Sequence, residues 1–426
     1  MANEMLGNGD GLEQQERTSG RGLTHGEALG DGRKIRVLLA HNRYIYRGGE
    51  DAVVEAECEL LRSRGHETLL YLEDNKELAK RNAAIAAIEA IWSFRASRKL
   101  RELIRQFQPD IIHVHNTFPQ LSPSIFWTAN ACGVPIVLTL HNYRYACAQG
   151  AFLRKGRICE DCVGRIPFRG IARRCYRHSY AQSLVLVASF AFHRAIGTYR
   201  NKVTSLIALS EFGIQKHIEC GMPRRKVLCK VNFIDVTTEK AAAPRMGGLF
   251  VGRLSVEKGI DVLLQALDTM SSMRLRIVGD GPLTEDVRRC RHMEFLGWKN
   301  NTDVYSLMQS ASYLVLPSTW YEGFPRTIAE AYACGLPVIG TRLGPMPEII
   351  EHGVTGLLFE PGSAQDLAEK MLWAEAHPEE MAKMGQRARE VHAEKYTSET
   401  NYRHLISIYS KVIRERKQGV SGFSGR

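Results

Sequence analysis

Short runs of apolar residues alternate along the chain with longer segments in which apolar residues recur every three or four positions. From residue 33 onward, this alternation predicts a parallel sheet with helices on both faces. A helix is expected from about Glu50 to Arg64, because Gly65 suits the left-handed conformation that closes helices. The expected strands of this first unit are Ile35 to Ala40, Thr68 to Leu72, Ile111 to His115 and Pro135 to Leu140.

The same alternation restarts after Val231 and predicts a second unit of the same kind. The expected fold class is therefore α/β, with two Rossmann-like doubly wound domains. Ligands of open α/β sheets bind beyond the carboxyl ends of the strands, so we expect the site in the cleft between the domains. The expected strands of the second unit are Gly248 to Val251, Arg274 to Val278, Tyr313 to Pro317 and Pro337 to Thr341.

The predicted segment boundaries follow these patterns. Residues 1–32 are rich in Gly, Glu and Gln and lack the apolar core of a secretory signal, so we expect a disordered tail. No run reaches the roughly 20 apolar residues that span a bilayer. The other segments are a first domain at 33–235 with an insertion at 144–180, a linker at 236–246, a second domain at 247–395, a C-terminal helix at 396–416 that packs back toward the first domain, and a tail at 417–426.

Positive charge is concentrated in one region. The net charge of +11 comes from 57 basic and 46 acidic residues, and Arg154 to Lys202 alone holds 11 Lys and Arg against Glu160 and Asp161. Clustered cations attract phosphate on nucleic acid, on anionic lipid or on a phosphorylated substrate. A surface that is merely basic and solvated remains the alternative. The hydrophobic fraction of 44% is ordinary for a soluble enzyme.

The segment YEGFPRTIAE is the richest in candidate chemistry, because it follows an expected strand and leads into a helix. Pro325 suits the first helical turn. The amides of Gly323, Phe324 and the start of the helix would then face the cleft, where unpaired N–H groups favour a phosphate. Glu330 is placed to accept hydrogen bonds from a ribose diol, and Glu322 from sugar hydroxyls.

Two glutamates eight residues apart are, by themselves, more typical of surface or capping acids. The stretch GRLSVEKG changes this interpretation, because it puts Arg253 and Lys258 on a strand-to-helix loop of the same domain. Two cations there can neutralise a diphosphate and stabilise it as it departs as a leaving group.

Three motifs in order, GR with EKG at 252–259, VGDGP at 278–282 and Glu-x7-Glu at 322–330, resemble the retaining GT-B glycosyltransferases of family four. The resemblance runs over roughly residues 33 to 415 and is to the bacterial polysaccharide or capsule type. It implies that Glu322 binds near the sugar and Glu330 on the ribose, while Arg253 and Lys258 hold the diphosphate. The base would be held near Gly279 and Gly297, largely by backbone groups.

The first domain carries a second set of candidate residues. Gly48 and Gly49, in the RGGE stretch after the first strand, allow backbone to approach a ligand closely, and the resemblance places this loop beside the donor phosphates. His141, directly after a strand, matches a family histidine that contacts the transferred sugar and assists the reaction. Of His113 and His115 on the neighbouring strand, we expect one to be a satisfied core histidine.

The resemblance implies a retaining hexosyltransferase that uses a UDP-, GDP- or ADP-linked sugar and a glycan or lipid-diphosphate-linked acceptor. Such an enzyme would serve cell-surface polysaccharide biosynthesis in the cytoplasm. No Asp-x-Asp pair occurs in the chain, so we expect no catalytic metal. The catalytic residues expected from the resemblance are His141, Glu322, Arg253 and Lys258.

Four cysteines lie inside the basic insertion with the spacing Cys-x11-Cys-x2-Cys-x12-Cys: Cys147, Cys159, Cys162 and Cys175. Four thiolates with a Cys-x2-Cys knuckle suit tetrahedral structural zinc, which would brace the loop without taking part in catalysis. Free or redox-active thiols and disulfides remain open as alternatives. A related subset of bacterial polysaccharide glycosyltransferases carries a similar insertion.

The segment from Tyr180 to Ile196 reads as a mostly apolar helix flanked by arginines. It suits an anionic membrane surface at the inner face of the plasma membrane, and equally a core helix.

Three rival functions remain open. A sugar phosphorylase or nucleotide-sugar epimerase would share the fold. A nucleic-acid-binding protein would leave Arg253, Lys258, Glu322 and Glu330 unexplained and would need interleaved aromatic residues, so we expect no nucleic-acid partner. A nicotinamide enzyme is disfavoured, because no Gly-x-Gly-x-x-Gly follows a strand.

Overall fold

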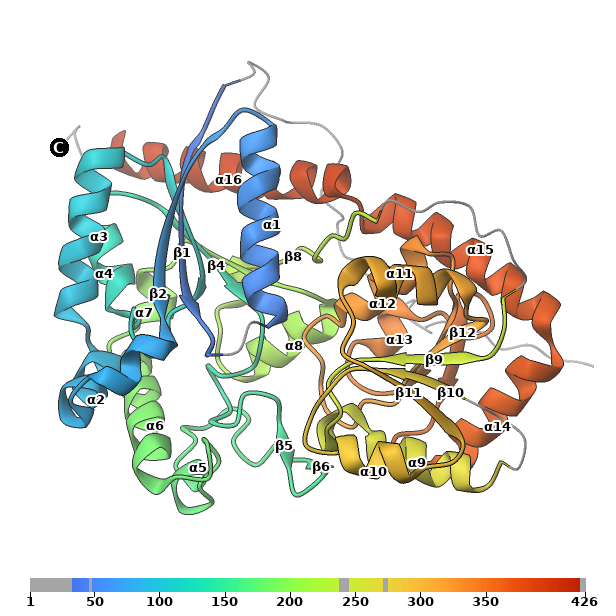
Figure 1. The fold of residues 1–426 in the computed structure, drawn as a ribbon. Helices are drawn as coiled ribbons and strands as arrows, with labels where there is room; N and C mark the ends of the chain where they lie inside the picture. Colours follow the sequence, from blue (N-terminus) through green and yellow to red (C-terminus); the bar gives the residue numbers. More distant parts are fainter. Residues whose placement is uncertain (1–32, 46–47, 237–244, 271–274, 422–426) are drawn as a thin grey trace, which may run out of the picture.

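The computed structural model describes residues 33–45, 48–236, 245–270 and 275–421. These residues form two α/β domains, each built around one parallel sheet (Figure 1). The predicted tail at 1–32, most of the predicted linker and residues 422–426 lie outside the described residues. The predicted α/β class with two doubly wound domains is confirmed.

The first sheet has six parallel strands in the order β2-β1-β3-β4-β7-β8. All four predicted strands are present. The two short strands beyond β4, β7 and β8, were not predicted. Val37 and Leu39 on β1 have no exposed surface, because helices cover both faces of this sheet. The strands are β1 (Arg36–Arg43), β2 (Glu67–Asp74), β3 (Ile111–Asn116), β4 (Ile136–Leu140), β7 (Ser205–Ala208) and β8 (Val227–Cys229).

The helix predicted after β1 ends as expected, because Gly65 adopts a φ of +81° two residues beyond α1 (Gly49–Ser63). The insertion contains a two-stranded hairpin, β5 (Leu153–Arg154) and β6 (Arg157–Ile158). The other helices before the second domain are η1 (Asn75–Lys80), α2 (Ala83–Ile91), α3 (Phe94–Phe107), α4 (Ser124–Ala131), α5 (Arg169–Ala172), α6 (Tyr180–Ala195), α7 (Thr198–Asn201), α8 (Glu211–Glu219) and η2 (Arg224–Lys226).

The second sheet repeats the arrangement, with six parallel strands in the order β11-β10-β9-β12-β13-β14. The four predicted strands are again present, although residue 274, where one was expected to begin, lies outside the described residues. The strands β11 and β14 were not predicted. The strands are β9 (Gly248–Val251), β10 (Leu275–Val278), β11 (Met293–Gly297), β12 (Tyr313–Leu316), β13 (Val338–Thr341) and β14 (Gly356–Phe359).

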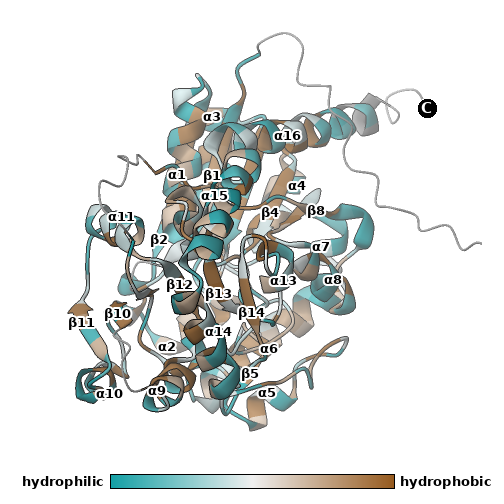
Figure 2. Cartoon of the chain, turned by 90° about the vertical axis from the view of Figure 1, so that its right-hand side faces the viewer, coloured by the Kyte–Doolittle hydropathy of each residue, from teal (hydrophilic) through white to brown (hydrophobic). Residues whose placement is uncertain are grey.

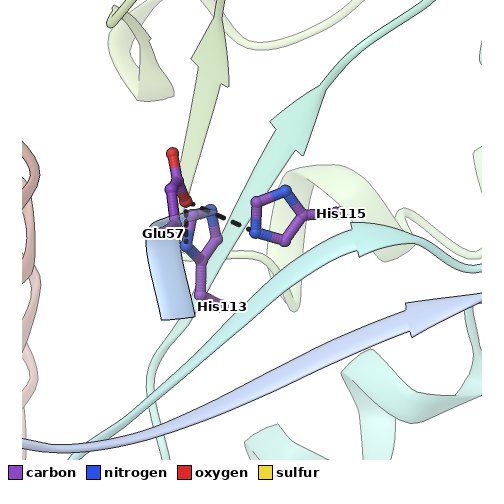
Figure 3. Close-up of side chains that lie close together, drawn as sticks. All are labelled: Glu57, His113 and His115. Atoms are coloured by element: carbon purple, nitrogen blue, oxygen red, sulfur yellow. Dashed lines mark ion pairs between the residues drawn. The ribbon is translucent and has the colours of Figure 1, made fainter. Parts of the chain in front are cut away.

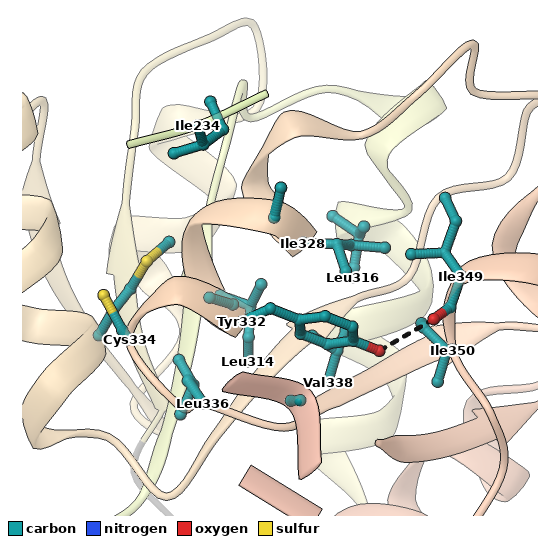
Figure 4. Packing of buried hydrophobic residues seen from close by; sticks show 14 of the residues in the cluster. Ile234, Leu314, Leu316, Ile328, Tyr332, Cys334, Leu336, Val338, Ile349 and Ile350 are labelled. Atoms are coloured by element: carbon teal, nitrogen blue, oxygen red, sulfur yellow. Dashed lines mark hydrogen bonds between the residues drawn. The ribbon is translucent and has the colours of Figure 1, made fainter. Parts of the chain in front are cut away.

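The core beside this sheet is organised around Tyr332 on α12 (Arg326–Ala333) (Figure 4). Its ring is fully buried, and its hydroxyl donates to the carbonyl oxygen of Ile349 at 3.1 Å and lies 2.7 Å from Thr355 Oγ1. Those contacts fix α12, the helix that follows residues 321–325, which we call the donor loop. The helices of this domain are η3 (Val256–Lys258), α9 (Ile260–Asp268), α10 (Thr284–Arg289), α11 (Asn301–Ser310), α12 (Arg326–Ala333), α13 (Met346–Ile349), α14 (Ala364–Ala376) and α15 (Pro378–Lys395).

The C-terminal helix α16 (Ser398–Ser421) leaves the second domain and lies along the first (Figure 1). Leu405, Tyr409 and Val412 pack with Val37 and Leu39 of β1 in one buried cluster. The chain therefore crosses between the domains twice.

Hydropathy follows this layering. Figure 2 shows hydrophobic residues on the strands β13 and β14, whereas the surface helices α8 and α10 are largely hydrophilic. Within the described part of the chain, no helix combines the length and the apolar character required to cross a membrane.

Candidate active site

A cleft of about 400 Å³ lies between the two domains, where the carboxyl ends of the central strands meet. Both domains contribute to its walls. The first domain supplies Gly49, Glu50, His141, Asn142 and Arg144, among others, and the second supplies Lys258 and residues 320–327.

Lys258 and Glu322 form the charged centre of the second domain's wall. Lys258 Nζ lies 2.6 Å from Glu322 Oε1, and Ser318 Oγ donates to the same oxygen at 2.8 Å. Burial opposes the ionisation of Glu322, but the charge and hydrogen bonds of its neighbours outweigh it and hold its pKa below the ordinary value. Glu322 is therefore an ionised acceptor that is itself only 6% exposed.

The position of Lys258 depends on the glycine that follows it. Gly259 has a φ of +72°, and a Cβ there would overlap the carbonyl oxygen of Pro317 at the end of β12. Only glycine allows the β9 loop to approach β12 this closely. Two segments more than 60 residues apart are thereby brought to one edge of the sheet.

Four of the expected donor residues of this domain lie outside the walls of this cleft: Arg253, Gly279, Gly297 and Glu330. Arg253 is exposed on the loop after β9 and forms no ion pair with any described residue. Gly279 N donates to the carbonyl oxygen of Gly297 at 3.0 Å, so these two glycines lie together at the carboxyl ends of β10 and β11. Gly279 has a φ of +145° and packs on the backbone of Gly252, which leaves no room for a side chain.

The loop before α12 presents backbone to the cleft as expected. Gly323, Phe324 and Pro325 all line it, and Pro325 is the residue that precedes the first turn of the helix. Glu330 lies further along α12, 3.8 Å from Arg326, and is not part of the cleft wall. Burial raises the pKa of Glu330, because the positive charge of Arg326 offsets that penalty only in part.

Gly48 and Gly49 begin α1 on the opposite wall. Asp51 accepts a hydrogen bond from the Gly48 amide at 2.7 Å, which fixes the start of the helix. Gly49 lines the cleft and faces Arg326 of the second domain. A Cβ added at Gly49 would lie 3.8 Å from Arg326 Cδ. Gly48 is not among the cleft residues.

His141 follows β4 and lines the cleft. Its Nε2 lies 2.9 Å from His115 Nδ1, and the two rings are stacked with centroids 5.2 Å apart. Burial lowers the pKa of His141; Glu50 and Glu57 oppose this effect, whereas Lys230 reinforces it. The ring is therefore neutral at neutral pH.

The two walls touch at His141. A Cβ on Gly323 would overlap the His141 carbonyl oxygen, so glycine is required for the donor loop to meet the first domain. Tyr143 Oη donates to the carbonyl oxygen of Glu322 at 3.5 Å. Tyr321 packs against Phe152 of the insertion and Phe212 of α8, with ring centroids 6.1 and 4.8 Å away.

The four cysteines of the insertion gather, but their sulfurs do not converge tightly. All four are free thiols, so the disulfide alternative is not seen. Burial raises the pKa of the Cys162 thiol to about 11, and the nearby Cys147, Cys159 and Cys175 add to this effect. Among the described residues, no three of these sulfurs lie within 4.8 Å of one another. A tetrahedral zinc site would therefore require the loop to contract.

Several residues of the site were not predicted from the sequence. Asn142 Nδ2 donates to Glu50 Oε1 at 2.7 Å, and Tyr44 Oη donates to Glu50 Oε2 at 2.9 Å. The position of Glu50 directly after Gly49 was a usable signal, because a helix N-terminus at the carboxyl end of a strand faces the ligand. Of His113 and His115, one was expected to be a satisfied core histidine; His115 contacts His141 directly, a contact that was not predicted.

Two family models match the chain in order. The model described as Glycosyltransferase Family 4 matches residues 47–238, and the model described as Glycosyl transferases group 1 matches residues 248–391. The chain is 26% identical over 391 residues to the protein named uncharacterized glycosyltransferase MJ1178 of Methanocaldococcus jannaschii, an alignment that covers 89% of this chain and 99% of MJ1178.

Two further proteins are similar to the chain. One is the putative colanic acid biosynthesis glycosyltransferase WcaL of Escherichia coli, 27% identical over 48% of this chain and 55% of WcaL. The crystal structure of Anabaena HepE in complex with UDP superposes with a TM-score of 0.60 at 18% identity, covering 88% of this chain and 99% of HepE. The chain is therefore a glycosyltransferase of the GT-B fold, with a family 4 domain followed by a group 1 domain.

Proposed function

We propose that the protein is a retaining hexosyltransferase that takes a sugar from a nucleotide-sugar donor in cell-surface polysaccharide biosynthesis. The observation that carries this proposal is the Lys258–Glu322 pair, which faces His141 across a cleft between two Rossmann-like domains. An ammonium for a diphosphate and a carboxylate for sugar hydroxyls lie side by side there. The colanic acid assignment of WcaL supports the pathway.

In this proposal the acceptor hydroxyl attacks the sugar on the face from which the diphosphate leaves. The departing diphosphate takes the acceptor's proton, and Lys258, Arg253 and the N-terminal amides of α12 stabilise its growing charge. Glu330 accepts from the ribose, and the backbone near Gly279 and Gly297 holds the base.

A UDP-linked sugar is the first donor to test, because HepE has been solved with UDP and with UDP-glucose. GDP- and ADP-linked sugars complete the panel. A donor present at 100 times its dissociation constant adds about 2.7 kcal/mol to the unfolding free energy, which a thermal-shift assay detects. No shift with any member of the panel would contradict the proposal.

Product analysis then separates the reaction classes. An α-linked product from an α-linked donor supports retaining transfer, whereas a sugar phosphate or an epimerised nucleotide sugar would support the phosphorylase or epimerase alternative. Activity should survive EDTA, because charged side chains and helix amides replace a bridging metal. An absolute requirement for magnesium or manganese would contradict this mechanism.

We further propose that the four insertion cysteines bind a structural zinc ion and that the acceptor is a glycan or a lipid-linked diphosphate at an anionic membrane surface. Zinc would deprotonate the thiols and hold the insertion against Tyr321 of the donor loop. The exposed apolar side chains of α6, beside the basic residues of the insertion, support the membrane surface.

A further inference from the structure

A buried row of polar side chains connects α1 to His141. Glu57 Oε2 on α1 lies 3.5 Å from His115 Nε2 on β3, and His115 Nδ1 lies 2.9 Å from His141 Nε2. Figure 3 shows the Glu57 carboxylate facing both His113 and His115. Glu57 and His115 are at most 2% exposed, so their polar atoms must be satisfied within the protein.

Glu57 is ionised in this setting. Lys230 Nζ lies 2.6 Å from Glu57 Oε1, and both side chains are 1% exposed. Burial opposes ionisation, but the charge and hydrogen bond of Lys230 outweigh it and lower the pKa of Glu57. Its second oxygen, Oε2, has no hydrogen-bond partner at ordinary distance and can only accept.

His113 Nδ1 lies at the same 3.5 Å from Glu57 Oε2, but both nitrogens of His113 have closer partners. Its Nδ1 lies 2.8 Å from Tyr409 Oη of α16, and its Nε2 lies 2.8 Å from Thr139 Oγ1 of β4. Glu57, His113 and His115 converge closely enough to suggest a metal site. The ammonium of Lys230 on Glu57 and a hydroxyl on each nitrogen of His113 occupy the positions that a metal would need, so hydrogen bonding explains the cluster better.

The remaining polar atoms determine where the protons are. His115 Nε2 and Glu57 Oε2 both lack a closer partner and face each other, so the proton of His115 belongs on Nε2. The neutral ring then has a bare Nδ1, which accepts from the His141 Nε2–H group. This leaves Nδ1 of His141 without a proton, and among the described residues it has no hydrogen-bond partner.

We propose that Glu57 and His115 are positioning residues that hold His141 as its Nε2–H tautomer, so that Nδ1 accepts a hydrogen bond from a hydroxyl of the bound sugar. The proposal rests on the proposed role of His141 in transfer. Its structural part, the tautomer, is independent of that role.

The test is the isosteric variant Glu57→Gln in the full chain. The new carbonyl accepts from Lys230, and the new amide donates to His115 Nε2. His115 then carries its proton on Nδ1 and donates to His141, which moves the His141 proton from Nε2 to Nδ1. Nitrogen-15 NMR of histidine-labelled protein without ligand distinguishes the two tautomers, with the His141 signals assigned by their loss in His141→Asn.

Glu59→Gln is the matched control, because Glu59 is exposed on the same helix. It should leave His141 in the Nε2–H form. Glu57→Gln strands the charge of Lys230, so a second variant, His115→Phe, keeps the Glu57–Lys230 ion pair and removes only the link. It should give His141 a mixture of tautomers and lower kcat about tenfold with little change in the donor KM.

A folded Glu57→Gln or His115→Phe protein in which His141 remains wholly in the Nε2–H form would overturn the inference. If the tautomer changes as expected while His141→Ala retains full turnover, the positioning network stands and the proposed role of His141 in transfer is wrong. The two failures are therefore distinguishable.

Discussion

Lys258 Nζ lies 2.6 Å from Glu322 Oε1, so the cation expected at the diphosphate and the acid expected at the sugar neutralise each other. The pair is preorganised, because Ser318 also donates to Glu322 and Gly259 fixes the loop that carries Lys258. A donor would therefore meet side chains that are already oriented.

We expect Lys258→Met to reduce kcat about 100-fold, because a cation that stabilises the leaving group is removed. It should also lower the unfolding free energy at neutral pH by roughly 3 kcal/mol, because Glu322 would remain buried and uncompensated. Steady-state kinetics and chemical denaturation measure the two effects. Lys383→Met, at an exposed position on α15, is the control.

This ion pair also predicts a pH dependence. The folded-state pKa of Glu322 lies below its ordinary value, so the pair stabilises the fold above that ordinary value and loses its contribution as the pH falls through the lowered one. Lys258→Met should weaken this dependence. If the unfolding free energies of the wild type and the variant changed with pH in parallel, the ion pair would not be the source of the dependence.

Glu330 should behave in the opposite way. Burial raises its folded-state pKa, so the ionised side chain destabilises the free enzyme, and this cost is relieved as the pH falls through the raised value. Glu330→Gln should not lower the melting temperature at neutral pH. It should weaken donor binding by about 1.5 to 3 kcal/mol, or roughly 10- to 100-fold, because a charged acceptor for the ribose is lost. Glu369→Gln is the control. If calorimetry finds that Glu330→Gln binds the donor with unchanged affinity, Glu330 does not bind the ribose.

Gly323→Ala should separate the two walls of the cleft, because its Cβ would overlap the His141 carbonyl oxygen. A displacement of about 1 Å at reacting groups costs on the order of 100-fold in rate, so we expect a loss of that order in kcat. Gly353→Ala is the control, because Gly353 has a φ of +78° but nothing within 4 Å of a Cβ. It should lower stability and retain kcat. If Gly323→Ala is fully active, the two walls do not need this contact.

The sequence predicted the long, regular features well and the contacts between distant segments poorly. The eight predicted strands are present, because buried parallel strands are continuous apolar runs. The half-exposed β11 carries a weaker signal, whereas β14 is as short and as buried as the predicted β13 and was missed all the same. The Lys258–Glu322 and His115–His141 contacts depend on packing between strands, which residue order alone does not specify.

The cysteine insertion should contain one zinc ion per chain. The raised pKa of Cys162 means that metal binding must displace protons, so affinity should fall as the pH is lowered. Cys162→Ser should remove the metal and lower the melting temperature, whereas Cys290→Ser in the second domain should do neither. Elemental analysis that finds less than about half an equivalent in the wild type would favour free thiols.

The helix α6 has apolar residues on two faces, one buried in the core and one exposed on the surface. Leu186 and Val187 are fully buried, as the core-helix interpretation predicts, whereas Leu184 and Tyr180 are 53% and 52% exposed. Exposed apolar side chains one turn apart, close to a cluster of arginines, suit insertion at the level of lipid head groups.

We therefore expect the protein to float with vesicles that contain anionic phosphatidylglycerol and to remain in the soluble fraction with neutral phosphatidylcholine vesicles. Leu184→Glu should reduce the floated fraction several-fold, because a charge would enter the apolar contact. Leu372→Glu is the control, because Leu372 is equally exposed at 53% on α14 of the other domain. Equal flotation with both vesicle types, or an equal loss in both variants, would exclude α6 as the membrane contact and leave a soluble glycan as the acceptor to test.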